Sequence, residues 1–131
     1  MNKVSDGDNF KFRVGKGSRT ICRLEAVVSP EAIIKGLSGR ATLQSGHGML
    51  FIFPEISRQS MWMPEMKFPL DIIWLDEDFT IVHITKDCKP CKTRINCPSY
   101  SSKYQVQYAI EFKAGDADEY GFEIGKALFP V

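Results

Sequence analysis

Gly48-Met49-Leu50-Phe51-Ile52-Phe53-Pro54 is the stretch that decides the fold of this chain. The unbroken apolar run within it, residues 49–53, is typical of a strand whose two faces are both buried. We expect Pro54 to end that strand, because proline has no N–H group to donate to a sheet. A short candidate strand at 61–63 and a second apolar run at 70–75 follow, so this region predicts the centre of a β-rich core.

Strand patterns continue on both sides of this stretch. Residues 10–14 and 20–28 are typical of two strands joined by a Gly-Lys-Gly-Ser turn. Residues 80–85 are expected to form a hairpin with the 70–75 run across an acidic turn. Further strands are expected at 104–112 and 127–129. Alternation within 104–112 places Glu111 with Gln105 and Gln107 on the mostly polar face.

The clearest helix signal is short. Ser29 is a favoured N-cap, Pro30 suits the first helical position, and Gly36 provides a left-handed stop, so a helix is expected over 30–35. One more helical turn is expected over 116–120. The whole pattern predicts a mainly β fold: a jelly-roll-like β-sandwich or partly closed barrel with one or two short helices. We expect a single domain over residues 1–131, in which 1–9 are a flexible N-terminal segment.

Composition argues against several classes of function. The 131 residues are 44% hydrophobic and 25% charged, with a formal net charge of +1. We therefore expect neither extensive disorder nor a nucleic-acid partner attracted by a basic global field. No window approaches the roughly 18 apolar residues of a membrane span, and the first residues lack the apolar core of a secretory signal. We expect a cytoplasmic protein without a membrane partner.

Basic residues gather locally in two segments, 1–23 and 86–103. Neither segment holds a dense run of like charges, so solvated surface is the expected explanation. If the two segments met in space, they would form a basic patch for an anionic partner. The basic residues concerned are Lys3, Lys11, Arg13, Lys16, Arg19, Arg23, Lys86, Lys89, Lys92, Arg94 and Lys103.

A series of short motifs runs along residues 20–130. After the predicted helix come Gly36-Leu37, Arg40, the Gly48–Pro54 stretch, Trp62-Met63 and Pro69-Leu70-Asp71. The series ends with Cys97-Pro98-Ser99-Tyr100, Ile110-Glu111, Ala114-Gly115, Gly121 and Gly125. In their order and spacing these motifs resemble the domain-of-unknown-function family 192, found in bacteria, archaea and some phages. The resemblance implies a compact β-sandwich of jelly-roll character with small helical inserts, and it implies no reaction.

The chain departs from the family pattern at several positions. It has Ile33 where the family usually has arginine, Ser38 where a methionine is usual, and Lys126 where an acidic residue is frequent. Residues 64–66, Pro-Glu-Met, replace a common Lys-Asn-Thr. If the polar members of these motifs build a ligand site in the family, this chain has changed part of it.

Four residues are candidates for a ligand site: Arg40, His47, Trp62 and Asp71. Asp71 directly precedes an apolar run, so its burial would require a cation or several backbone donors, and Arg40 would be a bidentate partner. Trp62 would offer a stacking platform for a sugar or base, and His47, between two glycines, would line a cavity. These residues predict a pocket for a polar or saccharide-like ligand. The alternatives are that Asp71 is a structural staple and that Trp62 packs in the core.

The four cysteines allow three chemical states. Cys88 and Cys91 have the C-x2-C spacing of a zinc knuckle, but no second matched pair is present. Further ligands would be Cys97 together with Cys22, His47 or His83. Cys91 and Cys97 would alternatively close a short disulfide loop, as the resemblance to exported relatives with a similar segment also implies. In a reducing cytoplasm all the cysteines would stay thiols.

These observations favour a small non-enzymatic ligand-binding or accessory domain, for which no cofactor is expected. One alternative is a hydrolase or lyase that uses carboxylates, for which Glu65, Asp71 and Glu111 are candidates if they converge. Another is an interaction module whose basic surface meets a protein or nucleic acid. The sequence predicts neither the identity of the ligand nor the oligomeric state.

Overall fold

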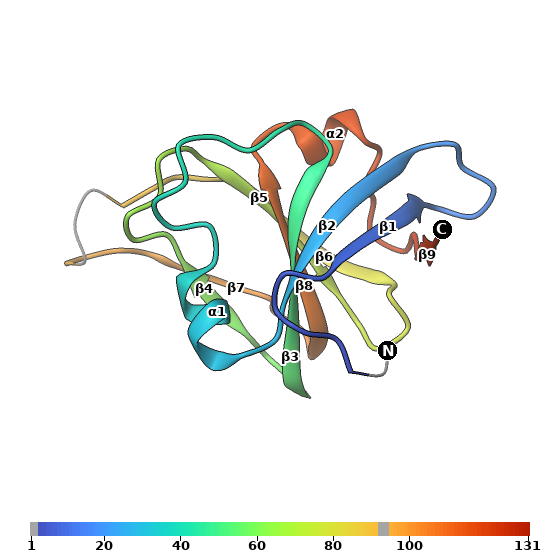
Figure 1. The fold of residues 1–131 in the computed structure, drawn as a ribbon. Helices are drawn as coiled ribbons and strands as arrows, with labels where there is room; N and C mark the ends of the chain where they lie inside the picture. Colours follow the sequence, from blue (N-terminus) through green and yellow to red (C-terminus); the bar gives the residue numbers. More distant parts are fainter. Residues whose placement is uncertain (1–2, 92–94) are drawn as a thin grey trace.

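A curled sheet of seven strands dominates the computed structural model, which describes residues 3–91 and 95–131. The strand order is β6-β5-β8-β3-β2-β1-β9, and a separate two-stranded arm pairs β4 with β7 (Figure 1). The strands are β1 (Asn9–Val14), β2 (Ile21–Val27), β3 (His47–Ser57), β4 (Ser60–Trp62), β5 (Leu70–Leu75), β6 (Ile81–Cys88), β7 (Ser99–Ser101), β8 (Val106–Lys113) and β9 (Leu128–Pro130). The helices are α1 (Pro30–Lys35) and α2 (Asp116–Glu119).

The two ends of the sheet meet, so the sheet forms a partly closed barrel. Ile81 N donates to Lys126 O at 2.8 Å, and Leu128 N donates to Phe79 O at 3.0 Å. Thr80 and Ala127 form an antiparallel bridge between the same two segments. The predicted fold class, mainly β with one or two short helices, is confirmed.

The parallel pair of strands β2 and β3 places α1 on one face of the sheet. These two strands pair in parallel, so the chain must cross over between them, and α1 lies in that crossover. Ser29 caps the helix, because its Oγ accepts a hydrogen bond from Ala32 N at 3.2 Å. Gly36 ends it with φ +49°. Local signals therefore determine this helix, as expected from the sequence.

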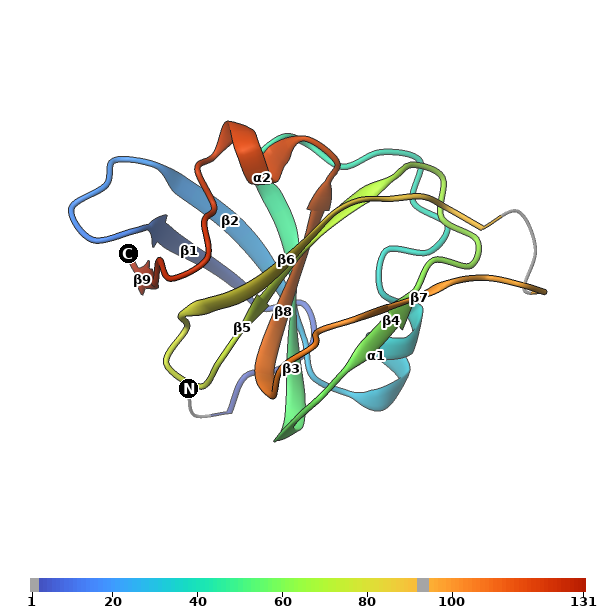
Figure 2. The same cartoon turned by 180° about the vertical axis from the view of Figure 1, so that it is seen from behind.

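Successive residues of the central strands enter two different hydrophobic clusters, because side chains alternate between the faces of a sheet. The inner cluster lies inside the curl and includes Phe12, Leu24, Leu50, Ile73, Ile110 and Phe112. The outer cluster lies on the opposite face and includes Phe51, Phe53, Met63, Met66, Ile72 and Trp74. In both views α1 and the β4–β7 arm lie together on one side of the sheet, away from β1 and β9 (Figures 1 and 2).

Two strand predictions are wrong in detail. Pro54 does not end β3, which continues to Ser57. The β3–β8 register shifts between Ile52 and Ser57, so the missing N–H group of Pro54 interrupts no regular ladder. Glu111 is not on a polar face but is buried, at 5% exposure, because its face of the sheet is the one that carries the outer cluster.

The segment before β1 is hydrogen-bonded to β2 and the residues after it. Ala26 N donates to Asp8 O at 2.8 Å, and the carboxylate of Asp6 accepts from Val28 N at 2.6 Å and Ser29 N at 3.0 Å. The hydroxyl group of Ser29, together with these two backbone bonds, lowers the pKa of Asp6. Within the described part of the chain, no helix is long and apolar enough to cross a membrane.

Candidate functional site

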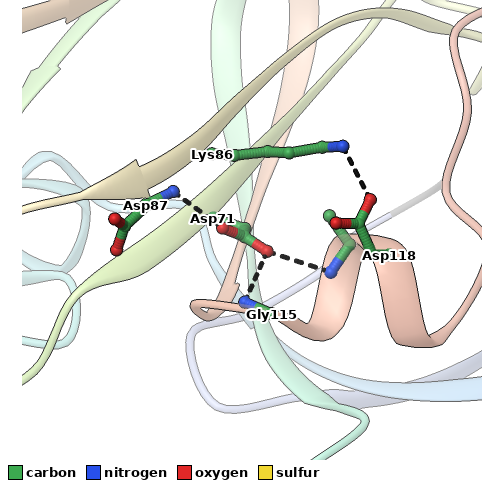
Figure 3. Close-up of polar contacts among 6 residues, drawn as sticks. Asp71, Lys86, Asp87, Gly115 and Asp118 are labelled. Carbon is green, nitrogen blue, oxygen red and sulfur yellow. Dashed lines mark hydrogen bonds and ion pairs between the residues drawn. The ribbon is translucent and has the colours of Figure 1, made fainter.

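Asp71, at the start of β5, is nearly completely buried, at 2% exposure. Its carboxylate accepts three backbone hydrogen bonds: from Asp87 N at 2.9 Å, Gly115 N at 2.9 Å and Ala117 N at 3.0 Å (Figure 3). These donors lie at the irregular end of β6 and at the beginning of α2. Asp71 therefore joins three elements, and backbone donors satisfy it in place of a cation.

Arg40 does not pair with Asp71, so that expectation is wrong. The guanidinium of Arg40 binds the carboxylate of Glu25 on β2, with its Nη1 and Nη2 atoms 3.2 Å from Oε1. Both side chains are more than a third exposed. Arg40 and His47 line one cleft of about 360 Å³, whereas Trp62 lines a different pocket. The residues expected to form one site therefore lie in separate places.

Acidic neighbours pair with two of the basic residues in the 86–103 segment. Lys86 Nζ lies 2.6 Å from Asp118 Oδ1, a contact visible in Figure 3, and Lys89 Nζ lies 2.8 Å from Asp87 Oδ2. The pairing with Asp118 raises the pKa of Lys86. Lys92 and Arg94 lie outside the described residues. The described contacts therefore offset part of the positive charge in this segment.

The cysteines are found in two states. Cys91 and Cys97 are joined by a disulfide, and Cys22 and Cys88 are buried free thiols. Burial raises the pKa of Cys22 and that of Cys88 to about 12, so both remain protonated near neutral pH. Among residues 3–91 and 95–131, no three His, Cys, Asp or Glu side chains gather in a way that would hold a metal ion.

A pocket of about 500 Å³ lies on the outer face of the sheet, between α1, β3 and the arm strand β4. Its walls are mostly apolar, and Trp62 stands beside it with 43% of its surface exposed. The polar lining residues are Gln59, Ser60 and Glu111. The apolar lining residues include Ile33, Leu37, Phe51, Phe53, Met61, Met63 and Met66. Cys91, one of the two disulfide cysteines, supports this wall, because its N–H group donates to Met63 O at 3.0 Å.

Glu111 is the unusual residue of this pocket. It lies in the central strand β8, opposite Met49 of β3 on one side and Ile72 of β5 on the other. Among the described residues, no hydrogen bond contributes to the pKa of its carboxyl group, and no side-chain oxygen is both fully buried and without a partner, so the carboxyl oxygens open into the pocket. A β-carbon added at Gly36 would lie 3.6 Å from Glu111 Oε1 and 3.3 Å from Phe51 Cζ. The end of α1 therefore passes close to this carboxyl group, and only glycine fits there without crowding.

Burial raises the pKa of Glu111 to about 8. Desolvation is the only cause, because no neighbouring charge contributes. At neutral pH the carboxyl group is therefore mostly protonated and can both donate and accept a hydrogen bond. A perturbed carboxyl group on the wall of an apolar pocket is a recognised mark of a functional site.

From its sequence position, Glu111 is predicted only as one of three carboxylates of a hydrolase or lyase site. They do not converge, because neither Glu65 nor Asp71 lines the Glu111 pocket. The signal for Glu111 was available in its position, since it stands between Ile110 and Phe112 in a strand that proved to be central. The position of Glu111 between two apolar residues indicates burial only when both faces of β8 are known to be covered.

Comparisons with known proteins agree with the observed fold. The sequence model of the DUF192 family, described as "Uncharacterized ACR", matches residues 12–129. A protein from Sinorhizobium meliloti 1021, provisionally called a transcription regulator, is 28% identical, with a TM-score of 0.85 and 98% of each chain covered. A protein of unknown function from Novosphingobium aromaticivorans DSM 12444 is 23% identical, with a TM-score of 0.80 over 91% of this chain and 82% of the other. No curated protein shows significant sequence similarity.

Proposed function

We propose that this chain, which belongs to the uncharacterised DUF192 family, is a small ligand-binding domain whose site is the Glu111 pocket. The proposal rests on the geometry of that pocket. One observation carries the proposal. Glu111 is only 5% exposed, but no described side-chain oxygen or nitrogen is both fully buried and without a partner, so its unbonded carboxyl oxygens open into the pocket that Glu111 lines. A largely desolvated carboxyl group that is still accessible from a pocket is placed to bond a ligand. A ligand that supplies the missing partner would explain why the chain keeps a glutamate there.

We propose a ligand with a mainly apolar body and one polar group, in place of the saccharide expected from the sequence. Gln59, Ser60 and Glu111 are the polar residues along the pocket, too few to replace the water around a sugar's hydroxyl groups. Trp62 keeps its proposed role as an aromatic contact at the pocket. Two positions that depart from the family pattern, Ile33 and Met66, line the same pocket, so the ligand is expected to differ between members.

Neither alternative function gains a specific observation. A glycosidase-type hydrolase needs two carboxylates, and Glu111 is the single ionisable residue among those that line the pocket in the described part of the chain. A nucleic-acid-binding role would suit the name of the Sinorhizobium protein. Against it, Lys86 and Lys89 are paired with acidic residues, which weakens the basic patch that such a role needs.

A titration with 2-phenylethanol tests the proposal, because this probe joins a phenyl body to one hydroxyl group. We expect saturable shifts of the Trp62 indole N–H and the Gly36 amide in 1H–15N spectra, at about millimolar affinity for so small a probe. Ile33→Trp fills the pocket and should abolish the shifts. Ile124→Trp, at an exposed position that does not line the pocket, should retain them.

Two results would contradict the proposed function. One is the absence of any saturable shift at the pocket for 2-phenylethanol and for the charged probes described below. The other is the same affinity in Ile33→Trp as in the native protein, which would place the probe elsewhere.

A further inference from the structure

We infer that the ligand is an organic cation: a protonated amine on an apolar body, whose ammonium group binds the carboxylate of Glu111. The inference rests on the proposed function, since it names the ligand class of the same pocket. Three features support it: the charge of the pocket walls, the aromatic ring beside Glu111, and the desolvation of Glu111 before any ligand binds.

The charge of the walls selects against anions. Glu111 is the one ionisable residue among the described residues that line the pocket. The cations Lys35 and Arg40 line a different cleft, which shares Gly36 with this pocket. A ligand carboxylate or phosphate would therefore lose its water without gaining a cation, whereas an ammonium group would gain a charge-assisted hydrogen bond.

An aromatic ring borders the same point as the carboxyl group. Phe51 Cζ and Glu111 Oε1 are the atoms that a β-carbon at Gly36 would meet, at 3.3 and 3.6 Å. A cation held at the carboxylate would therefore lie close to the Phe51 ring, and the apolar body attached to it would pack against that ring. Phe53 and Trp62 extend the aromatic wall for the rest of the ligand.

The fold has already removed the carboxyl group from water. For most buried ion pairs, the desolvation of both partners offsets the attraction between them. Here most of the desolvation of the carboxyl group precedes binding, because Glu111 is only 5% exposed before the ligand arrives. A pocket of about 500 Å³ also exceeds the needs of one lysine side chain and lies within the ~300–1,000 Å³ typical of small-molecule sites. The size of the pocket thus favours a small-molecule amine over the lysine side chain of another protein.

Binding must release a proton at neutral pH. The carboxylic acid of Glu111 loses its proton to solvent, and the resulting carboxylate pairs with the ammonium group, which keeps its own protons. The pKa of Glu111 is about 8, so this release is nearly complete below pH 7 and disappears above pH 9. Cys88 is the other titratable group whose charge interacts with Glu111, and its pKa of about 12 keeps it a thiol throughout.

Three probes with one apolar body test the inference: phenethylamine, 2-phenylethanol and 3-phenylpropionate. At pH 8.5, calorimetry should show the amine binding about tenfold or more tightly than the alcohol, and the carboxylate binding weakest. The amine should weaken about tenfold per pH unit below pH 8, with nearly one proton released per molecule at pH 6.5. The alcohol should release none.

Glu111→Gln is the matched variant, because it keeps the shape of the side chain and removes its charge. In this variant the alcohol should still bind in the pocket, because the amide group of glutamine also forms a hydrogen bond with a hydroxyl group. The preference for the amine, its pH dependence and the proton release should all disappear. If the variant does not fold, the pH profile of amine binding to the native protein decides the question.

The outcomes separate the inference from the proposed function. If the alcohol occupies the pocket and the amine binds no more tightly, the ligand is not a cation and the proposed binding function stands. Equal amine preference in Glu111→Gln would also overturn the inference. If none of the three probes binds in the pocket, both fail.

Discussion

Two regions of this protein bury a carboxyl group, but only one of them provides hydrogen-bond donors for it. At the Asp71 junction, where β5 meets β6 and α2, the carboxylate accepts three backbone hydrogen bonds. In the Glu111 pocket, no described group bonds the carboxyl. The two residues lie only one register step apart on neighbouring strands, since Asp71 pairs with Phe112 and Ile72 pairs with Glu111.

The difference arises from the backbone around each residue. Asp71 lies where the β5–β6 register shifts and where α2 begins, and such places leave N–H groups without strand partners. Glu111 lies in β8, whose neighbours β3 and β5 pair with it on both sides. A central strand has no spare backbone donors. Burial beside a register shift and the start of a helix can therefore be structural, whereas burial within a regularly paired stretch of strand leaves the carboxyl group available to a ligand.

The largest effect is expected from Asp71→Ala, which leaves three backbone N–H groups without an acceptor. We expect a loss of about 3–5 kcal/mol in the free energy of unfolding, measured by urea denaturation. Asp118→Ala is the matched control, because Asp118 is exposed and pairs only with exposed Lys86; its loss should be under about 1 kcal/mol. Similar losses in both variants would show that the three backbone hydrogen bonds of Asp71 stabilise the fold no more than an exposed ion pair.

Glu111→Gln should act in the opposite direction and depend on pH. Between the ordinary pKa of 4.5 and the folded value of about 8, the unfolded chain releases the Glu111 proton and the folded protein retains it. Native stability therefore falls as pH rises through this window, by up to about 1.4 kcal/mol per pH unit, and levels off above pH 8.

Urea denaturation of both proteins at pH 5, 6.5 and 8 measures this effect. Relative to the native protein, Glu111→Gln should gain stability steadily across the series, because glutamine does not ionise. A difference that does not change with pH would mean that Glu111 titrates normally and that the contrast with Asp71 is smaller than the geometry indicates.

Gly36→Ala should have the smallest effect on stability and a specific effect on the pocket. Gly36 and Gly39 both have positive φ angles, of +49° and +81°, but only Gly36 has Phe51 and Glu111 beside its missing β-carbon. Each alanine variant should lose about 1–2 kcal/mol of stability, and Gly36→Ala should lose the more because its β-carbon also crowds Phe51. Only Gly36→Ala should weaken the binding of 2-phenylethanol. Equal weakening by Gly39→Ala would show that backbone strain, not crowding, is responsible.

The sequence predicted features that depend on neighbouring residues. Ser29, Pro30 and Gly36 specify α1 through its caps, and the structure places the helix at Pro30–Lys35 as expected. The 70–75 strand likewise has the predicted bounds. In each case the decisive groups lie within a few residues of one another, so the local pattern contains the necessary physics.

The candidate site was less predictable, because its properties depend on distant segments. Alternation correctly separates Glu111 from Ile110, but it cannot show that α1 and the β4–β7 arm cover the face that Glu111 occupies. Arg40 could not be assigned to Glu25 before the parallel pairing of β2 with β3 was known. For Asp71, the sequence argument named backbone donors as one of two solutions, and the fold supplies that one.

The closure of the barrel also constrains the order in which the protein can fold. β9 pairs with β1 near the start of the chain, and residues 125–128 bond the beginning of β6. These contacts join segments far apart in sequence, and such non-local contacts form slowly. During synthesis the inner strands must wait for residues 125–130 to leave the ribosome before the ring is complete. Until then β1 and β6 present open edges, which expose the incomplete chain to unwanted strand pairing.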